Sequence, residues 1–260
     1  MALCEYEAKD GVALLTLNDP PANAYSHDMF REIDDAILKA RFDENVHVVV
    51  ITGKGEKFFC AGANIDLLAK ATPYWKYNFC LHANETLNRL EHTPKLVIAA
   101  INGHCVGGGL EVALAADLRV VRRSAGLIGL PEVALGVLPG TGGTQRLARL
   151  LGKSRSIELM VEGRRMKPDE ALAMGIVNKV LDDEAFLEKA LEYARSFCPP
   201  AKAPLAVGRI KRAVQSGLEM SFEGGLALER ELQAELFASE DAKEGFVAFV
   251  EKRAPQFKAR

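Results

Sequence analysis

Hydrophobic and polar positions along the first two-thirds of the chain follow two different spacings, which predict strands interleaved with helices. Short apolar runs predict strands at residues 3–9, 11–17, 46–51, 96–101, 117–121 and 126–129. Apolar residues three or four positions apart predict helices at residues 26–43 and 73–90, with a shorter helix from Asn64. Asp10-Gly11 would join the first two strands as a hairpin. Because the run at 46–51 is almost wholly apolar, we expect it in a parallel sheet with helices on both faces.

The pattern becomes almost entirely helical after Gly143. Apolar spacing and helix-start residues predict helices at residues 145–151, 155–161, 168–174, 184–197, 205–215, 222–237 and 240–253. Val177–Val180 is the one segment in this part that looks like a strand. Pro199-Pro200 marks a change in composition, so we predict a mixed α/β region over residues 1–199 and a helical region over residues 200–260.

The composition fits an ordinary globular protein that binds a small or medium-sized ligand. Of the 260 residues, 48% are hydrophobic and 26% are charged, and this length suffices for a large core. The formal net charge is −2, which offers no electrostatic attraction for nucleic acid or for an anionic membrane. We therefore expect neither as a partner.

The cysteines and histidines predict a reducing compartment and no metal site. Five scattered cysteines include no Cys-x-x-Cys pair, and an odd number argues against a closed disulfide framework. The five histidines lack metal-ligand spacing. The first residues show no basic or apolar export segment, and no run approaches the roughly 18 apolar residues of a membrane span. These features predict a cytoplasmic protein.

The stretch from Lys95 to Arg146 combines features of a catalytic site. A buried strand leads through Gly107-Gly108-Gly109 into a helix, whose first backbone N–H groups lack internal partners and can stabilise a developing negative charge. Glu111 lies in an early turn of that helix, and Glu132 follows a proline. Two carboxyl groups beside such a helix start can carry out acid–base chemistry. Each could instead be an acidic residue that simply favours the N-terminal end of a helix.

Two glycine-rich segments fail the tests for nucleotide-binding loops. Gly140-Thr-Gly-Gly-Thr144 lacks the Gly-Lys-Ser/Thr ending of a Walker motif, and Gly103–Gly109 lacks the spacing of a dinucleotide-binding fingerprint. We interpret the first segment as a tight structural turn. We interpret His104 as a packing or hydrogen-bonding residue, and Cys60 and Cys105 as small buried residues.

Taken together, these residues resemble the enoyl-CoA hydratase/isomerase family, also called the crotonase superfamily. The matching segments occur in family order and cover nearly the whole chain, at residues 20–24, 59–65, 99–103, 107–111, 130–133, 138–146 and 245–253. The resemblance implies an α/β fold, with a spiral core of ββα units, two roughly perpendicular sheets and a helical C-terminal region that assembles trimers. It implies a homotrimer or a homohexamer built from two trimers.

The resemblance also implies a substrate and a shared chemistry. Family substrates are acyl-CoA thioesters, and the thioester enolate is stabilised by two backbone N–H groups that match those of Ala63 and Gly108. Glu111 and Glu132 match the two glutamates of family hydratases. The positions that match CoA-binding ones are Ala22, Ala24, Ala61, Ala63, Ile65 and Gly108, with Phe249 and Lys252 reaching the CoA of a neighbouring subunit. We expect no cofactor beyond the coenzyme A of the substrate.

Three kinds of function fit this resemblance. An enoyl-CoA hydratase is preferred because both glutamates are present. A Δ3,Δ2-enoyl-CoA isomerase, or another enolate reaction such as thioester hydrolysis, would use the same fold and the same backbone donors. A non-catalytic assembly subunit or an RNA-binding member would be expected to lack the glutamates or to carry a basic helix, and neither feature is present.

Overall fold

A six-stranded sheet lies at the centre of the computed structural model, which describes residues 2–260. Its strands are β1 (Cys4–Lys9), β2 (Val12–Leu17), β3 (Val48–Gly53), β5 (Leu96–Ile101), β7 (Leu118–Arg122) and β10 (Lys179–Leu181), adjacent in that order. β1 and β2 are antiparallel and the other neighbours run parallel. Asp10 and Gly11 have φ angles of 51° and 81°, as the tight turn between β1 and β2 requires. The predicted hairpin is confirmed.

Helices cover both faces of this sheet, which explains why its central strands are apolar throughout. Alternate residues of β3 point to opposite faces. Val49 and Ile51 join a core that includes side chains of α1 (His27–Phe42) and α3 (Pro73–Glu91). Val48 and Val50 pack in a second cluster with Phe186 of α8 (Phe186–Arg195). The prediction of a parallel sheet between helix layers is therefore confirmed.

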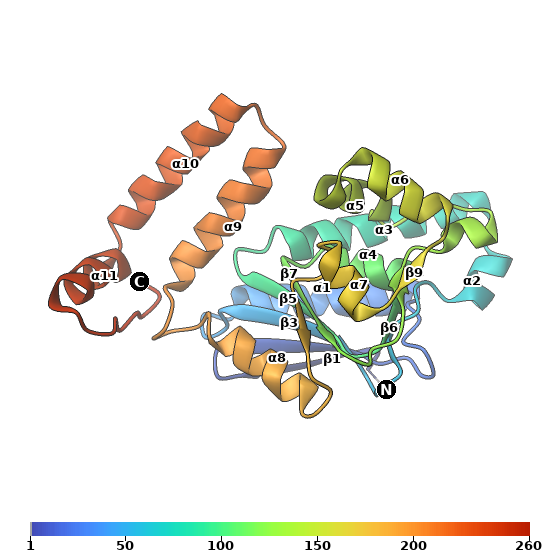
Figure 1. Cartoon of the computed structure of the whole chain (residues 1–260), viewed down its shortest axis with the longest axis horizontal. Helices are drawn as coiled ribbons and strands as arrows, with labels where there is room; N and C mark the ends of the chain where they lie inside the picture. Colours follow the sequence, from blue (N-terminus) through green and yellow to red (C-terminus); the bar gives the residue numbers. More distant parts are fainter. Residues whose placement is uncertain (1) are drawn as a thin grey trace.

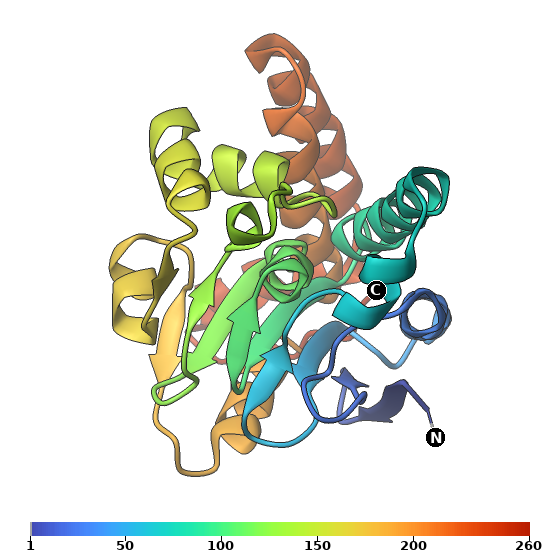
Figure 2. The same ribbon diagram turned by 90° about the vertical axis from the view of Figure 1, so that its right-hand side faces the viewer.

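A smaller, four-stranded sheet brings three segments of the candidate site to one edge. Its strands are β4 (Phe58–Cys60), β6 (His104–Val106), β8 (Ile128–Gly129) and β9 (Arg165–Met166), adjacent in that order. β4, β6 and β8 are parallel, so their carboxyl ends meet at one edge. Soon after these three ends begin the short helices α2 (Ile65–Lys70) and α4 (Gly108–Leu114) and the 3₁₀ turn η1 (Glu132–Leu135). Figure 2 shows the strands in the middle of the body, with most helices above them and α8 (orange) below.

The C-terminal helices form an arm that projects from this body (Figure 1). The arm contains α9 (Pro204–Leu218), α10 (Phe222–Phe237) and α11 (Glu240–Glu251). The helices α5 (Gly143–Leu151), α6 (Lys153–Val161) and α7 (Pro168–Ala173) remain with the body. The predicted division at residue 200 falls between α8 and the arm, and the assignment of two domains stays a prediction. Within residues 2–260, no helix is both long enough and apolar enough to cross a membrane.

Candidate active site

Three turns of the chain meet at the carboxyl ends of β4, β6 and β8. A Cβ atom placed on Gly62 would lie 2.9 Å from the backbone nitrogen of Gly108. A Cβ atom placed on Gly107 would lie 3.1 Å from Oε1 of Glu132. Gly62 and Gly107 have φ angles of 90° and 57°, which other residues rarely adopt. Glycine at both positions therefore lets the three turns touch.

The backbone N–H groups of Ala63 and Gly108 are free to bind a ligand. The N–H of Tyr25 donates to the carbonyl of Gly62 at 2.9 Å, and the N–H of Asn64 donates to the carbonyl of Tyr25 at 3.0 Å. Because these bonds flank Ala63 in a parallel bridge, the N–H of Ala63 itself points away from Tyr25. Gly108 is the first residue of α4, where no helical acceptor exists. Neither N–H donates to another group of residues 2–260.

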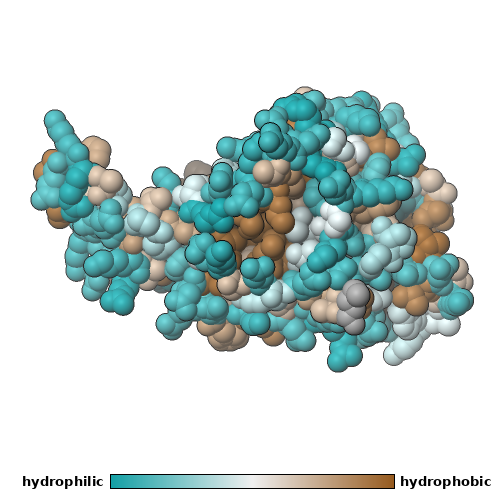
Figure 3. Space-filling view, turned by 90° about the horizontal axis from the view of Figure 1, so that it is seen from below, coloured by the Kyte–Doolittle hydropathy of each residue, from teal (hydrophilic) through white to brown (hydrophobic). Residues whose placement is uncertain are grey.

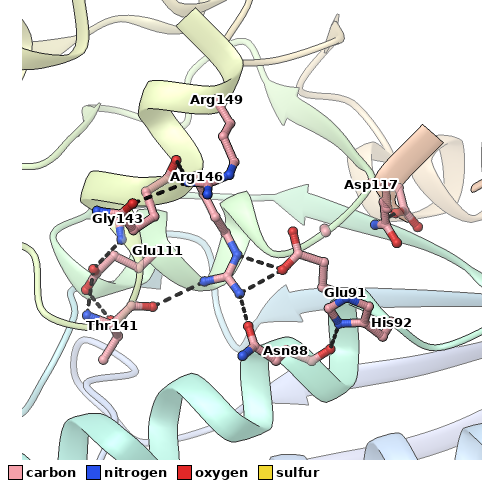
Figure 4. A network of polar contacts seen from close by, with 12 residues as sticks. Asn88, Glu91, His92, Glu111, Asp117, Thr141, Gly143, Arg146 and Arg149 are labelled. Carbon is pink, nitrogen blue, oxygen red and sulfur yellow. Dashed lines mark hydrogen bonds and ion pairs between the residues drawn. The ribbon is translucent and has the colours of Figure 1, made fainter. Parts of the chain in front are cut away.

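Glu111 is a buried carboxylate that the Gly140–Thr144 loop holds in place. Its side chain comes from α4 and is 2% exposed. Oε1 accepts hydrogen bonds from the backbone N–H groups of Thr141 (2.8 Å) and Gly143 (2.7 Å), and Oε2 accepts one from the Thr141 hydroxyl (Figure 4). Burial raises the pKa of Glu111, while these hydrogen bonds and the charge of Lys76 act in the opposite direction.

Contacts from α3 and α5 hold the Gly140–Thr144 loop in place. The loop therefore positions a carboxylate, in addition to forming the tight turn predicted from the sequence. Arg146 of α5 contacts Glu91 of α3 at 2.8 Å and donates to Oδ1 of Asn88 at 2.7 Å. Its Nη1 also donates to the carbonyl of Thr141 at 3.4 Å (Figure 4). At Gly143, a Cβ atom would lie 3.0 Å from Oε1 of Glu111. The glycine thus allows the loop to approach the carboxylate closely.

Glu132 differs from Glu111 in having an unoccupied oxygen atom. Its Oε2 is buried and has no hydrogen-bond partner among the described residues. Burial, with a smaller contribution from the charge of Glu111, raises the pKa of Glu132 to about 7. Oε1 of Glu132 lies against Gly107, at the start of the helix α4 that carries Glu111. A carboxyl group that titrates near neutral pH is suited to exchange protons with a ligand.

The residues matched to CoA binding fall into two separate groups. Residues 22–25 lie beside residues 61–65, since the N–H of Ala61 donates to the carbonyl of Ala22 at 3.0 Å and Tyr25 pairs with Ala63. This contact places Ala22, Ala24, Ala61, Ala63 and Ile65 together at one edge of the site. Phe249 and Lys252 lie at the end of α11, far from α2 in Figure 1. Within one chain they do not join the group, and their contact with a neighbour's CoA stays a prediction.

Three residues with roles in this geometry escaped the sequence analysis: Tyr25, Thr141 and Gly143. The Tyr25 hydroxyl is buried and lies 3.3 Å from Oγ1 of Thr141. An isolated tyrosine in a loop gives no sequence signal of this contact. For Thr141 and Gly143 the available signal was the glycine-rich loop, because backbone N–H groups in such a loop suit an anion. His104 accepts a hydrogen bond from the N–H of Leu127 at 2.9 Å, in line with its predicted hydrogen-bonding role.

Nothing within residues 2–260 resembles a metal centre, because no group of three or more His, Cys, Asp or Glu side chains is suitably placed. The expectation that the protein works without a metal or a separate cofactor stays a prediction. Among the groups that the site does offer are two backbone donors and two carboxyl groups.

Known proteins share both the sequence and the fold. A family model described as Enoyl-CoA hydratase/isomerase matches residues 7–260. The short-chain-enoyl-CoA hydratase of Clostridium acetobutylicum is 40% identical over 248 residues, which cover 95% of this chain and 94% of the relative. An enoyl-CoA hydratase structure from Geobacillus kaustophilus has a TM-score of 0.97 at 45% identity, covering 100% of this chain and 98% of the other. One from Bacillus anthracis has a TM-score of 0.93 at 35% identity, covering 99% and 100%.

Proposed function

The chain belongs to the enoyl-CoA hydratase/isomerase family, and from that premise we propose that it is an enoyl-CoA hydratase that adds water across a 2-enoyl-CoA double bond. The observation that carries the proposal is that two carboxyl groups, of Glu111 on α4 and of Glu132 against the start of α4, lie beside two unoccupied backbone donors. An enolate reaction without water addition would need the donors but only one acid–base group. Both carboxyl groups together favour hydration.

The backbone donors serve the charge that develops on the thioester oxygen. Attack of water at C3 moves electrons toward the carbonyl, so negative charge builds on that oxygen as the enolate forms. The N–H groups of Ala63 and Gly108 come from separate turns that touch at Gly62, so one oxygen can accept from both. Loss of one such donor costs about 3–4 kcal/mol of transition-state stabilisation.

The two glutamates handle the protons of the attacking water. One O–H proton of the water must leave as its oxygen bonds to C3, and a proton must be delivered to C2. Glu111 is held rigidly by three donors and is suited to orient the water. Glu132 has a free oxygen and a pKa of about 7, which suits proton exchange at neutral pH. Because the groups interact, the acid and base roles belong to the pair.

The projecting arm supports a proposal of self-assembly into a homotrimer, or a hexamer of two trimers. Several large apolar side chains of the arm are exposed in the single chain, including Leu218 (75%), Phe222 (79%) and Phe249 (86%). Figure 3, which views the molecule from below, shows apolar surface on the arm and in a band near the middle of the molecule. Such surface normally marks a protein interface. A second copy of the chain would also bring Phe249 and Lys252 to a neighbour's CoA. Sedimentation analysis would measure the mass of the assembly.

We also propose a cytoplasmic location. All five cysteines lie within the described residues and are unpaired, which fits a reducing compartment.

Purified protein and crotonyl-CoA provide the direct test of function. Hydration removes the conjugated double bond, so the absorbance of the enoyl thioester should fall as 3-hydroxybutyryl-CoA forms. The Glu111→Gln/Glu132→Gln double variant is the control. Isomerisation of a 3-enoyl-CoA without hydration, or release of free CoA, would instead support the isomerase or hydrolase reaction. Salt-sensitive RNA retention without any acyl-CoA turnover would support the non-catalytic alternative.

A further inference from the structure

Tyr25 contacts the segments that carry the two backbone donors and the loop that holds Glu111. Its backbone bonds to Gly62 and Asn64 on either side of Ala63. Its side chain lies against the other donor, because a Cβ atom on Gly108 would be 1.8 Å from the Tyr25 Oη. The same hydroxyl lies 3.3 Å from Oγ1 of Thr141. One buried aromatic residue therefore joins both backbone donors to the loop that holds Glu111.

The direction of the hydrogen bonds follows from the number of protons. The Thr141 hydroxyl has one proton and donates it to Oε2 of Glu111. In the contact between the two hydroxyls, the Tyr25 O–H must then be the donor. The Tyr25 side chain is 3% exposed, and burial raises its pKa well above the ordinary value, so the hydroxyl keeps its proton. The chain runs from Tyr25 through Thr141 to Glu111.

We propose that Tyr25 is a positioning residue for Glu111, whose hydroxyl orients and polarises the Thr141 hydroxyl that binds the carboxylate. A hydroxyl that accepts a hydrogen bond is a stronger donor, because hydrogen bonds in a chain polarise one another. The Tyr25 hydroxyl therefore stabilises the ionised form of Glu111 without touching it. The proposal rests on the proposed function only insofar as Glu111 takes part in hydration.

Other groups act on the same carboxylate and must stay constant in a test. Lys76 of α3 favours the ionised form of Glu111, and Glu132 of η1 interacts with it. Arg146 of α5 contacts the Thr141 carbonyl, and the N–H of Gly143 donates to Oε1. Replacement of Tyr25 by phenylalanine removes one hydroxyl and leaves all of these in place.

The experiment titrates Glu111 in wild type and in Tyr25→Phe by infrared difference spectroscopy without substrate, with Glu111→Gln to assign the signal. The pKa of Glu111 should rise in Tyr25→Phe and rise further in Thr141→Val. In crotonyl-CoA hydration, kcat of Tyr25→Phe should fall about 3- to 10-fold, the usual effect of one neutral hydrogen bond, with KM unchanged. Site-specific 3-fluorotyrosine, a stronger donor, should move the Glu111 titration the opposite way.

Two controls separate this role from a structural one. Tyr6→Phe removes another buried hydroxyl, one without a partner among the described residues, and should alter neither titration nor kcat. In the Thr141→Val background, Tyr25→Phe should have no further effect, because the hydroxyl acts through Thr141.

An unchanged Glu111 titration in Tyr25→Phe, or an equal effect in both backgrounds, would overturn the proposal. If Tyr25→Phe does not fold, the fluorotyrosine titration decides. If wild type fails to hydrate crotonyl-CoA, the function is wrong, and the infrared titration still decides the role of Tyr25.

Discussion

The ammonium group of Lys211, on the arm, lies 2.8 Å from the carboxylate of Asp117, on the body, and both side chains are almost fully buried. The Lys211 ammonium also donates to the carbonyl of Lys95 at 3.0 Å, and Gln215 donates to Asp117 at 3.0 Å. These bonds attach α9 to the residues immediately before β5 and β7. The arm is therefore fixed to the body by a buried ion pair as well as by apolar contact.

Lys211→Met should destabilise the protein by about 3 kcal/mol, because it leaves the Asp117 carboxylate buried without its cation. The Lys211→Met/Asp117→Asn variant should recover part of this loss, since no uncompensated charge remains. Denaturant unfolding at equal protein concentrations measures both. Equal unfolding midpoints for wild type and Lys211→Met would show that the pair contributes nothing to stability.

Glu132→Gln should lower kcat for crotonyl-CoA hydration by about 10²- to 10⁴-fold, the usual contribution of a general acid–base group. The amide has a similar shape but cannot exchange the proton, so KM should change little. Glu85→Gln makes the same replacement at an exposed position of α3 and serves as the control. Comparable turnover in Glu132→Gln would remove Glu132 from the mechanism.

The raised pKa of Glu132 also predicts how stability depends on pH. The folded chain holds the proton up to a pKa of about 7, whereas the unfolded chain releases it near the ordinary value of 4.5. Between these values the folded state binds more protons, so stability falls as pH rises. Relative to Glu132→Gln, which has no proton to lose there, wild type should lose stability across this window and then level off. Denaturant unfolding at several pH values tests this. If the free energy of unfolding of wild type, relative to that of Glu132→Gln, rose with pH, the carboxyl group could not be buried and uncharged.

Gly108→Ala should lower kcat at least about 100-fold, because its methyl group would collide with the buried Tyr25 hydroxyl and displace a backbone donor. Gly217→Ala on α9 is a matched control, since its Cβ would meet no atom closer than 3.8 Å. In a helix, that change should raise stability by up to about 1 kcal/mol. Steady-state kinetics with crotonyl-CoA, together with thermal unfolding, separates the two effects. Full activity in Gly108→Ala would show that this N–H is not needed.

Much of the fold was predictable because its elements have local signals. The β1–β2 hairpin has its turn residues, and β3 and β5 are long apolar runs. β4, β6 and β9 were missed because each has only two or three residues. They form through pairing with neighbouring strands rather than through a long apolar pattern. Helix α8 starts at Phe186 rather than at Glu184, because Ala185 has a φ of 51°.

The candidate site was predictable only where residue type and motif coincide. Glu111 and Glu132 stand out as acids beside glycines and proline. Tyr25 and Thr141 do not, because their contact joins positions 116 residues apart in the sequence. A single sequence contains no record of that distance. Only the three-dimensional fold shows that the Tyr25 hydroxyl contacts the threonine that binds Glu111.

Two of the three bonds that hold Glu111 come from peptide N–H groups, and every amino acid except proline has such a group. Random substitution in this loop therefore has few ways to release the carboxylate, apart from proline, loss of the Thr141 hydroxyl or crowding at Gly143. Glu132 has no such anchor on Oε2. Laboratory evolution toward a different reaction should accordingly retain Glu111 and exchange Glu132 first.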